Sequence, residues 1–476
     1  LQLSTHAADP GFRMFTDQQG REMQAKLTSV NGDVVSIERQ DALATKVDIS
    51  IFSRQDQAYI REWELKEAWR KEELDPTRAF SLPTFADSAV LHVSEFGAKG
   101  DGKTDDGPAI RKAIAALVKS GKGSRLVFDE KTYYLGRFGA IDQPHIALSD
   151  VSDVSIDFSG AKIISTPYNS FLSIKNCENI KVNGFILDHD PVSFSQGLVE
   201  KIDKAKGAYY ARVSEGYVNP FRVKNYRNRN AMRKNPVWRI NPKDNSFLTG
   251  HIFLESISEV ADDEGLIKIV PQNKAVLDRV TIGEGWVCAL YYGGHGSNIG
   301  VSHSKNIYLE NYTIWSTKYG MTHSLSANTG RVYVRGAKIT YKPGTDRMFT
   351  ATKDGFHCKG NKIGPVIENS FFEGLFDDVM NISVGCFWVI KDLGENKYLV
   401  SKTPEPGDVL MSLRPIPGNF ENHKVLAVEP PESREGFSNR IPLSIITLDK
   451  AIPNLGLLKG KNLSVVGRHR IHITGP

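Results

Sequence analysis

Cysteine is scarce in this sequence: the chain of 476 residues has four cysteines, and no two of them are close together. The cysteines lack the paired spacing typical of a disulfide framework or a zinc site, so we expect Cys177, Cys288, Cys358 and Cys386 to be buried thiols. Long apolar runs are also missing. No stretch approaches the roughly 18 apolar residues of a membrane-spanning helix, and we therefore expect no membrane span.

Neither sign of charge dominates the chain. Its 60 basic and 55 acidic residues give a net charge of +5, which offers no basis for a nucleic-acid partner. Basic residues concentrate only in residues 222–239, which form either a solvated loop or a surface for an anionic polysaccharide. The chain begins with Leu1 rather than Met, so we expect that an export signal has been removed and that the protein is secreted or periplasmic.

A repeated pattern of alternating apolar residues is the main structural signal. The chain has 476 residues, which is enough for several structural units, and its 40% apolar and 24% charged residues are ordinary for a globular protein. The repeated segments are rich in β-branched and aromatic residues and have a period of two, which predicts strands rather than helices. The repeats start at Asp153, Asn179, Asn306, Arg331 and Gly364, with offsets of 26 (153 to 179), 25 (306 to 331) and 33 (331 to 364) residues. This repeat predicts a parallel β-helix, whose coils must stack to bury their inner faces.

The N-terminal region reads as a separate unit. Residues 1–64 contain short alternating strands with a turn at Asn31, and residues 65–88 form a charged helical linker that prolines interrupt. The strand-rich part resembles the SH3-like homology module found in secreted proteins of planctomycete-type bacteria. The resemblance implies a small accessory barrel.

The β-helix is predicted to begin at residue 89 and to continue to residue 190. The segment Val90 to Asp106 resembles the opening of pectinase-like right-handed β-helix proteins, in which a strand, a glycine-rich turn and a helix close the end of the coil stack. We expect this helix at residues 106–117, with Asp105 and Asp106 as its N-terminal caps.

Two segments interrupt the repeat, at residues 191–287 and 384–476. Both contain longer alternating strands separated by proline and glycine turns, and we expect each to contain a small antiparallel β-barrel inserted between coils. The coils between them, residues 288–383, carry the candidate catalytic residues. The predicted fold is therefore mainly β: a right-handed parallel β-helix with two inserted barrels and an N-terminal SH3-like barrel.

Three carboxylates recur at the length of one coil. Asp354 is followed by the pair Asp377 and Asp378 at nearly the interval that separates the repeated strands, and strands on adjacent coils lie about 4.8 Å apart. Consecutive residues of a plain strand face opposite sides, but at a corner or bulge both members of the pair can face one groove. The spacing therefore predicts three carboxylates on one wall.

Clustered carboxylates suit the cleavage of glycosidic bonds. Mutual repulsion raises the pKa of one carboxyl, which can then protonate a leaving oxygen while an ionised neighbour activates water. The alternative is that the three aspartates only cap turns or bind a structural calcium ion. We expect no metal and no cofactor at this site.

The active-site region resembles that of glycoside hydrolase family 110. The resemblance rests on residues 354–357 (Asp-Gly-Phe-His), 364–372 and 377–381 (Asp-Asp-Val-Met-Asn), and extends over about residues 88–476. Members of this family are inverting exo-α-galactosidases built on a β-helix, and many act on α-1,3-linked galactose. The resemblance implies that a galactose-containing glycan is the substrate, that Asp377 is the general acid, and that Asp354 and Asp378 hold the attacking water. The order within the adjacent pair stays open.

Other polar and aromatic residues of these coils are candidates for substrate binding. For each of them, a role in a turn or in the core is the alternative. Trp315 offers a flat face on which the apolar side of galactose can stack. The polar candidates are His323, Asn328, Arg347, His357 and Asn381.

Other functional classes remain open at this stage. One is a β-helix hydrolase of carrageenan- or uronate-type chains, another a β-helix lyase, and a third a noncatalytic carbohydrate-binding protein. The family continues with further coils where this chain stops at Pro476, so either one last strand re-enters the stack or the chain is a truncated or processed form. An uncovered final coil would favour contacts in a homodimer or indicate lost coils.

Overall fold

The computed structural model describes residues 12–39, 43–57, 59–60, 63, 87–223, 237–248, 252–290, 296–318, 320–362, 364–383, 387–412, 422–434, 436–437, 443–452, 462–466 and 472–474. Residues 65–86 of the predicted linker, most of the basic segment (224–236) and Cys386 lie outside the described residues.

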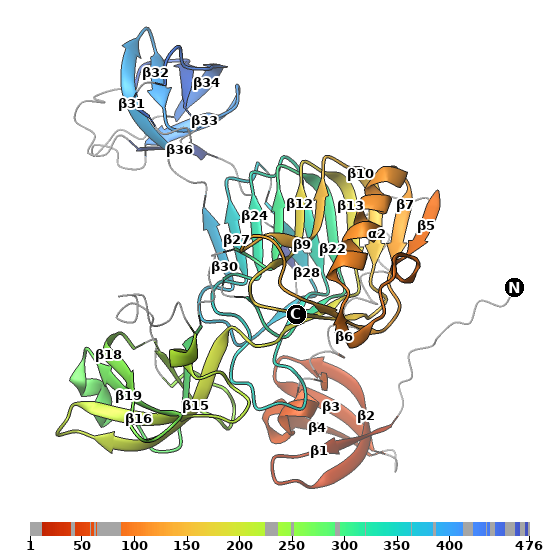
Figure 1. Cartoon of the computed structure of the whole chain (residues 1–476), viewed down its shortest axis with the longest axis vertical. Coiled ribbons are helices and arrows are strands. Elements are labelled where there is room, and N and C mark those ends of the chain that lie inside the picture. The colour runs from red at the N-terminus through yellow and green to blue at the C-terminus, as the bar shows by residue number, and fades with distance from the viewer. Residues whose placement is uncertain are drawn as a thin grey trace, which may run out of the picture.

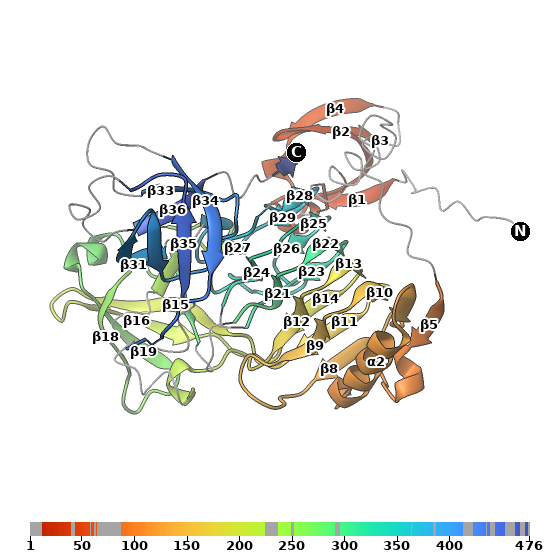
Figure 2. The same cartoon turned by 90° about the horizontal axis from the view of Figure 1, so that it is seen from above.

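Strands dominate the described chain, and the largest group of them builds a parallel β-helix from three sheets (Figures 1 and 2). A coil gives one strand to each sheet, in the order sheet 1, sheet 2, sheet 3 along the chain. Neighbouring strands within each sheet are parallel, as predicted for a β-helix.

In the part of the chain that the structure describes, the three sheets have eight, seven and six strands. Sheet 1 consists of β5 (Ala89–His92), β7 (Ser124–Val127), β10 (Ser152–Asp157), β13 (Glu178–Asn183), β22 (Lys305–Glu310), β25 (Val332–Arg335), β28 (Val366–Glu368) and β37 (His472–Thr474). Sheet 2 consists of β6 (Asp101–Asp105), β8 (Thr132–Leu135), β11 (Lys162–Ser165), β14 (Ile186–His189), β23 (Thr313–Ile314), β26 (Lys338–Ile339) and β29 (Phe371–Phe372). Sheet 3 consists of β9 (Pro144–Ser149), β12 (Ser170–Lys175), β21 (Ile299–Ser302), β24 (His323–Ser326), β27 (Phe356–Lys359) and β30 (Met380–Ser383).

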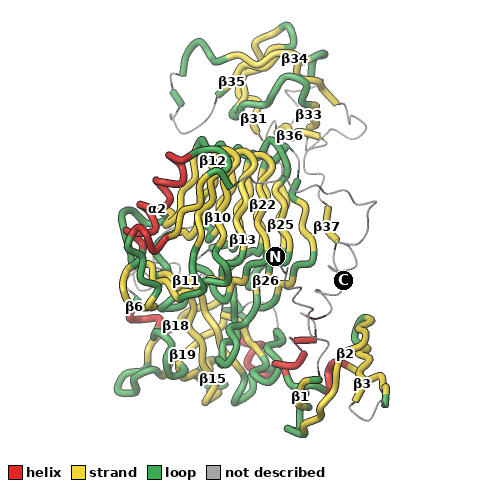
Figure 3. Tube along the Cα trace, turned by 90° about the vertical axis from the view of Figure 1, so that its right-hand side faces the viewer, coloured by secondary structure: helices red, strands yellow, loops and turns green. Residues whose placement is uncertain are grey.

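The repeats found in the sequence are successive strands of sheet 1, which Figure 3 shows side by side from β10 to β37. Ile180 on β13 is the register partner of Val154 on β10 and of Ile307 on β22, which in turn pairs with Val332 on β25. The steps from Val154 to Ile180 and from Ile307 to Val332 equal the intervals between the corresponding repeats of the sequence. The predicted coil repeat is confirmed.

Asparagine recurs at one corner of the coils for two physical reasons. Asp153, Asn179 and Asn306 all have positive φ angles, between 52° and 56°, which asparagine and aspartate tolerate better than other L-residues. Their side chains also form a ladder, because Asn179 Nδ2 donates to Asp153 Oδ1 (2.9 Å) and Asn306 Nδ2 donates to Asn179 Oδ1 (3.1 Å). The corner therefore fixes the stacking register.

Helix α2 (Gly107–Ser120) packs against β5, β7 and β9 at the N-terminal end of the stack. Its buried face is the predicted one and consists of Ile110, Ala113, Ile114 and Leu117. Asp106 occupies the N-cap position, but its carboxylate accepts hydrogen bonds from the backbone of Lys99 and Gly100 instead of from the helix. The predicted capping role is thus wrong for Asp106, which stabilises the glycine-rich turn. Asp105 does accept from the helix, at Gly107 N (3.0 Å).

The first insertion leaves the β-helix after β14 and returns at β21. It is an antiparallel sheet in the order β17 (Val237–Ile240), β20 (Gly285–Ala289), β15 (Phe194–Asp203), β16 (Ala208–Val213), β19 (Leu266–Pro271) and β18 (Leu254–Glu259). An antiparallel bridge joins Val237 to Ile252, so the two edges of the sheet approach each other. The sheet encloses its own core around Tyr209 and Trp286.

The second insertion follows β30. It is a closed barrel in the order β31 (Phe387–Gly394), β32 (Lys397–Val400), β35 (Ser444–Leu448), β34 (Asn422–Glu429), β33 (Val409–Ser412) and β36 (Asn462–Val466). After the barrel, β37 rejoins sheet 1 beside β28. In Figure 1 the two insertions lie on opposite sides of the β-helix.

The N-terminal unit is an antiparallel sheet of β1 (Arg13–Thr16), β2 (Glu22–Asn31), β3 (Val34–Arg39) and β4 (Ala44–Asp48). It buries a separate core that includes Phe15, Val35 and Phe52. Its likeness to an SH3-like module stays a prediction.

Short 3-10 helices occur at Ile49–Ile51, Val93–Phe96, Pro220–Arg222 and Lys274–Asp278. Within the described residues, no helix has the length and the apolar character that crossing a membrane requires. Cys177, Cys288 and Cys358 are buried thiols, as predicted.

Candidate active site

The loops that lead from sheet 2 to sheet 3 carry the three predicted catalytic aspartates. Asp354 lies in the loop between β26 and β27, and Asp377 and Asp378 lie in the next loop, between β29 and β30. The first insertion starts from the corresponding loop between β14 and β21. One wall of the β-helix thus presents both the aspartates and the insertion.

The strand register brings the two aspartate segments together. Ala351 bridges to Leu375 and Phe356 pairs with Met380, and the same offset between the two segments places Asp354 beside Asp378. Gly355 N donates to the carbonyl oxygen of Asp378 (2.9 Å). The predicted one-coil spacing is therefore the spacing of neighbouring chain segments.

Gly355 permits this close approach. A Cβ atom at this position would lie 2.6 Å from the carbonyl oxygen of Val379 and 3.4 Å from Leu375 Cδ1. The first distance is shorter than real Cβ contacts, and the atom it meets belongs to the backbone. A side chain at position 355 would therefore force the two aspartate segments apart.

The three carboxyl groups lie in different environments. Asp354 is buried, with 8% of its surface exposed, whereas Asp377 and Asp378 are exposed. Burial raises the pKa of Asp354, and the negative charges of Asp377 and Asp378 raise it further, while the charge of His357 opposes the rise. The site thus contains one buried carboxyl with a raised pKa beside two carboxyls that reach solvent.

Two of the predicted substrate-binding residues flank these carboxyls. His357 on β27 and Asn381 on β30 are register partners, and both are partly exposed. Asn381 Nδ2 lies 3.5 Å from Asp378 Oδ2, at the limit of a hydrogen bond. Both side chains are therefore placed to contact a ligand that occupies the carboxyl cluster.

Two other candidates lie in the interior and are not kept as proposed substrate contacts. His323 is fully buried, stacks on Phe356 with ring centroids 4.1 Å apart, and shares a hydrogen bond of 2.6 Å with the hydroxyl of Tyr312. Asn328 is 1% exposed, and its amide donates to the backbone of Val301 (3.1 Å) and to Asn361 Oδ1 (2.9 Å). Of the two roles considered from the sequence, their placement fits the core and corner role.

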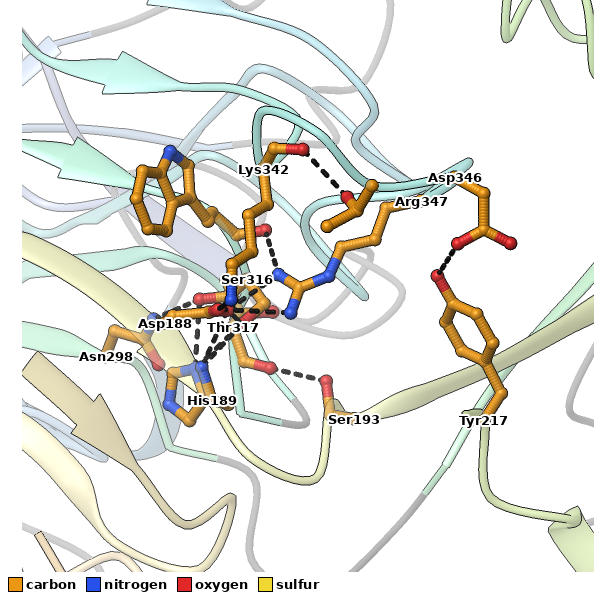
Figure 4. Close-up of polar contacts among 12 residues, drawn as sticks. Asp188, His189, Ser193, Tyr217, Asn298, Ser316, Thr317, Lys342, Asp346 and Arg347 are labelled. Carbon is orange, nitrogen blue, oxygen red and sulfur yellow. Dashed lines mark hydrogen bonds and ion pairs between the residues drawn. The ribbon is translucent and has the colours of Figure 1, made fainter. Parts of the chain in front are cut away.

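Arg347 belongs to a buried charge cluster, drawn in Figure 4. Its guanidinium donates to both carboxylate oxygens of Asp188, through Nη1 (2.6 Å) and Nη2 (3.1 Å). Asp188 also accepts from Lys342 Nζ (2.9 Å) and Ser316 Oγ (2.7 Å). Burial opposes ionisation of Asp188, but these partners outweigh it and lower its pKa to about 2.

The cluster ties the loop of Asp354 to a distant part of the chain. Asp188 stands at the end of β14, just before the first insertion, and sequence reasoning did not single it out. Its signal is the run of polar residues 188–190 that follows an apolar strand. Lys342 and Arg347 lie in the loop that leads to Asp354, so Asp188 holds that loop on the wall.

Trp315 lies next to this cluster. The indole is partly exposed, and Lys342 Nζ is 5.7 Å from the ring centroid. Its carbonyl oxygen accepts a weak hydrogen bond from Arg347 Nη1 (3.4 Å). Stacking of a sugar on Trp315 remains a proposal.

No arrangement of three or more His, Cys, Asp or Glu side chains suited to a metal ion occurs among the residues described. The groups that gather around the three aspartates are their carboxyls, the imidazole of His357 and the amide of Asn381.

Comparison with known proteins was made for the sequence and for the fold. No family model matches the chain. The chain is similar to the α-1,3-galactosidase B of Bacteroides thetaiotaomicron, with 25% identity over 338 residues, which are 66% of this chain and 54% of that protein. It is also similar to the α-1,3-galactosidase B of Akkermansia muciniphila, with 23% identity over 330 residues, which are 64% of this chain and 40% of that protein. The chain thus spans about half the length of these curated relatives.

Solved structures show weaker likeness. A putative glycosyl hydrolase from Parabacteroides merdae has 14% sequence identity and a TM-score of 0.25, over 62% of this chain and 96% of that one. An exopolygalacturonase from Thermotoga maritima has 16% identity and a TM-score of 0.29, over 62% of this chain and 55% of that one. Scores this low carry no argument, and the fold rests on the strand pairing.

Proposed function

We propose that the protein is an exo-acting, inverting glycoside hydrolase that releases terminal α-1,3-linked galactose from glycans. The observation that carries the proposal is the pairing of the Asp354 and Asp378 segments at one corner, with Asp377 adjacent and the pKa of Asp354 raised. The relatives named α-1,3-galactosidase B support galactose as the sugar and the 1,3 linkage.

The proposed reaction is a single displacement. One carboxyl gives its proton to the glycosidic oxygen as the bond from that oxygen to C1 breaks. Water attacks C1 from the opposite face and loses a proton to an ionised carboxylate, so the α-linked sugar leaves as β-galactose. Inverting enzymes hold the two carboxyls about 6.5–9.5 Å apart to leave room for this water.

Asp377 is the proposed general acid, with Asp354 and Asp378 holding the water, as the family resemblance implies. The raised pKa of Asp354 favours a second assignment, in which Asp354 itself carries the proton. Because neighbouring carboxyls titrate as a coupled group, a pH profile alone does not separate the two assignments.

Substrates with different leaving groups do separate them. An acidic phenol leaves without protonation, so an aryl α-galactoside should still be cleaved when the general acid is replaced, whereas a galactosyl disaccharide should not. Loss of the base impairs both substrates. Under the first assignment Asp377→Asn keeps activity on the aryl substrate and Asp354→Asn does not; the reverse result supports the second.

The function itself is tested by product analysis on a panel of α-galactosides, with the anomer followed by NMR. Initial release of free β-galactose is the expected result. A ladder of oligosaccharides would indicate an endo-acting hydrolase, and an unsaturated sugar would indicate a lyase. If Asp354→Asn and Asp377→Asn both keep full turnover on every cleaved substrate, the proposed machinery is wrong.

We also propose a secreted or periplasmic location, where polymeric glycans are accessible, and a homodimer. Cell fractionation and light scattering test these two points.

A further inference from the structure

The first insertion contacts both chain segments that carry the catalytic aspartates. Its strands β15, β17 and β20 meet the loop before Asp354 and the turn before Asp377 in one buried apolar cluster. This cluster lies on the face of the sheet opposite to the insertion's own core, which contains Trp286. The insertion is therefore packed against the active-site wall.

Gln196 on β15 holds the loop that leads to Asp354. Its side chain is fully buried, and both ends of its amide bind the loop backbone: Nε2 donates to Asp346 O (2.9 Å), and Oε1 accepts from Met348 N (2.9 Å). These two hydrogen bonds resemble the backbone hydrogen bonds between paired strands. Tyr217 adds a hydrogen bond from its hydroxyl to Asp346 Oδ1 (2.8 Å).

Trp238 on β17 holds the turn that carries Asp377. Its indole stacks on Phe376, the residue just before Asp377, with ring centroids 3.5 Å apart and ring planes within 4° of parallel. Phe376 in turn contacts Phe349, which lies in the loop before Asp354. The same insertion thus touches both aspartate segments.

We propose that the first insertion is a positioning element for the carboxyl cluster, with Gln196 and Trp238 as positioning residues that set the separation of Asp354 and Asp377. This inference rests on the proposed function. The β-ladder fixes the backbone of Gly355 and Phe356 against the next coil, and Phe376 N donates to Ala351 O (3.0 Å), so Asp377 lies between these two backbone contacts. Its placement therefore depends on Phe376 and on the indole behind it.

Electrostatic repulsion among the three carboxyls is the reason for such support. Three carboxyls on neighbouring segments repel one another, and packing against the insertion opposes a separation of the segments that carry them. A misplacement of about 1 Å in a catalytic group costs on the order of 100-fold in rate. The buried aromatic stack opposes this movement.

The test compares two tryptophans of the same insertion. Trp238→Leu should lower kcat by about 10- to 100-fold with little change in KM. Trp238→Phe, which keeps an aromatic face, should restore most of that loss. Trp286→Leu is the matched control: it removes an indole from the insertion's own core and should lower the Tm while leaving kcat within about twofold, since the described residues of that core include none from the loop before Asp354 or the turn before Asp377.

A pH profile separates positioning from mere loss of stability. If Trp238→Leu lets Asp354 and Asp377 move apart, their repulsion weakens and the alkaline limb of kcat should shift to lower pH. Gln196→Leu should shift it in the same direction. Trp286→Leu should leave the limb in place.

The results that would overturn the inference are distinct from those that would overturn the function. The positioning role is wrong if kcat falls equally in Trp238→Leu and Trp286→Leu. It is also wrong if the pH profile is unchanged in Trp238→Leu and Gln196→Leu. Inactive Asp354→Asn and Asp377→Asn variants would still support the catalytic proposal in that case.

Discussion

Asp354 and Asp378 lie beside each other on adjacent coils, where Gly355 N, next to Asp354, donates a hydrogen bond to the carbonyl oxygen of Asp378 (2.9 Å). The backbone of the β-helix thus carries one buried and one exposed carboxyl side by side. Burial and the neighbouring charges of Asp377 and Asp378 raise the pKa of Asp354. The wall and the residues that support it can be tested one substitution at a time.

Gly355→Ala should reduce both activity and stability. The new Cβ would meet the backbone oxygen of Val379 at 2.6 Å, so the strands must separate, at a cost of about 1–3 kcal/mol. We expect kcat to fall by at least as much as the loss of folded protein that the lower Tm implies. Gly300→Ala is the control, because a Cβ there meets nothing closer than 3.8 Å, and it should be tolerated. Normal kcat in Gly355→Ala would contradict the requirement for close approach.

Asp354→Asn should stabilise the fold at neutral pH while it impairs catalysis. The pKa of Asp354 is higher in the folded protein than in the unfolded chain, so its contribution to stability is present below the unfolded value of about 3.9 and is lost as pH rises through the raised pKa. The asparagine side chain does not ionise, so the variant does not lose stability in this way as pH rises. Urea unfolding at several pH values should show the variant gaining on the wild type as pH rises. A constant difference at every pH would refute the burial effect.

Asp188→Asn should destabilise the protein strongly. It leaves Arg347 buried without its carboxylate, and breaking one side of a buried ion pair costs about 3–5 kcal/mol. The pKa of about 2 means that Asp188 stabilises the fold above the unfolded value and that this contribution is lost only as pH falls toward 2. The expected readout is a lower urea midpoint at pH 7 and a converging midpoint in strong acid.

The control for this prediction is Asp278→Asn, which breaks an exposed pair with Lys204 and should change the midpoint little. The double variant Asp188→Asn with Arg347→Met should be less unstable than the sum of the single changes, because both partners are then neutral. Strict additivity would show that the two charges are not coupled.

His323→Gln should make the fold less sensitive to mild acid. Burial lowers the pKa of His323 to about 3, whereas the unfolded chain takes up the proton near pH 6.5. Its contribution is present above pH 6.5 and is lost as pH falls toward 3, at a rate of about 1.4 kcal/mol per pH unit. Unfolding free energies measured between pH 7 and pH 5 should therefore fall less steeply in the variant. An unchanged slope would mean that His323 does not titrate in this way.

Spacing along the chain predicted the neighbours within a column of coils. The intervals between the repeated strands and the separation of Asp354 from Asp378 all reappear as register, because every coil repeats the same path. The direction of side chains at the corners was harder to predict. His323 and Asn328 are polar residue types that often contact ligands. The alternation of strand β24 turns His323 inward, and the asparagine corner buries Asn328.

Contacts across the first insertion could not be read from spacing. Asp188 and Arg347 are 159 residues apart, and Gln196 and Met348 are 152 apart, so no repeat length relates them. The three-dimensional path of the insertion brings them together. The sequence thus predicted the carboxyl cluster but not the residues that hold its loops in place, such as Asp188 and Gln196.

The separation of Asp188 from Arg347 also constrains biosynthesis. On the ribosome, the acid emerges long before its basic partners, and it must remain hydrated until the whole intervening sheet has been made and folded. Contacts that close such long loops form slowly. The wall that carries Asp354 can therefore be completed only after residue 347 has been made, and a nascent chain stalled before residue 342 would have coils but an incomplete wall.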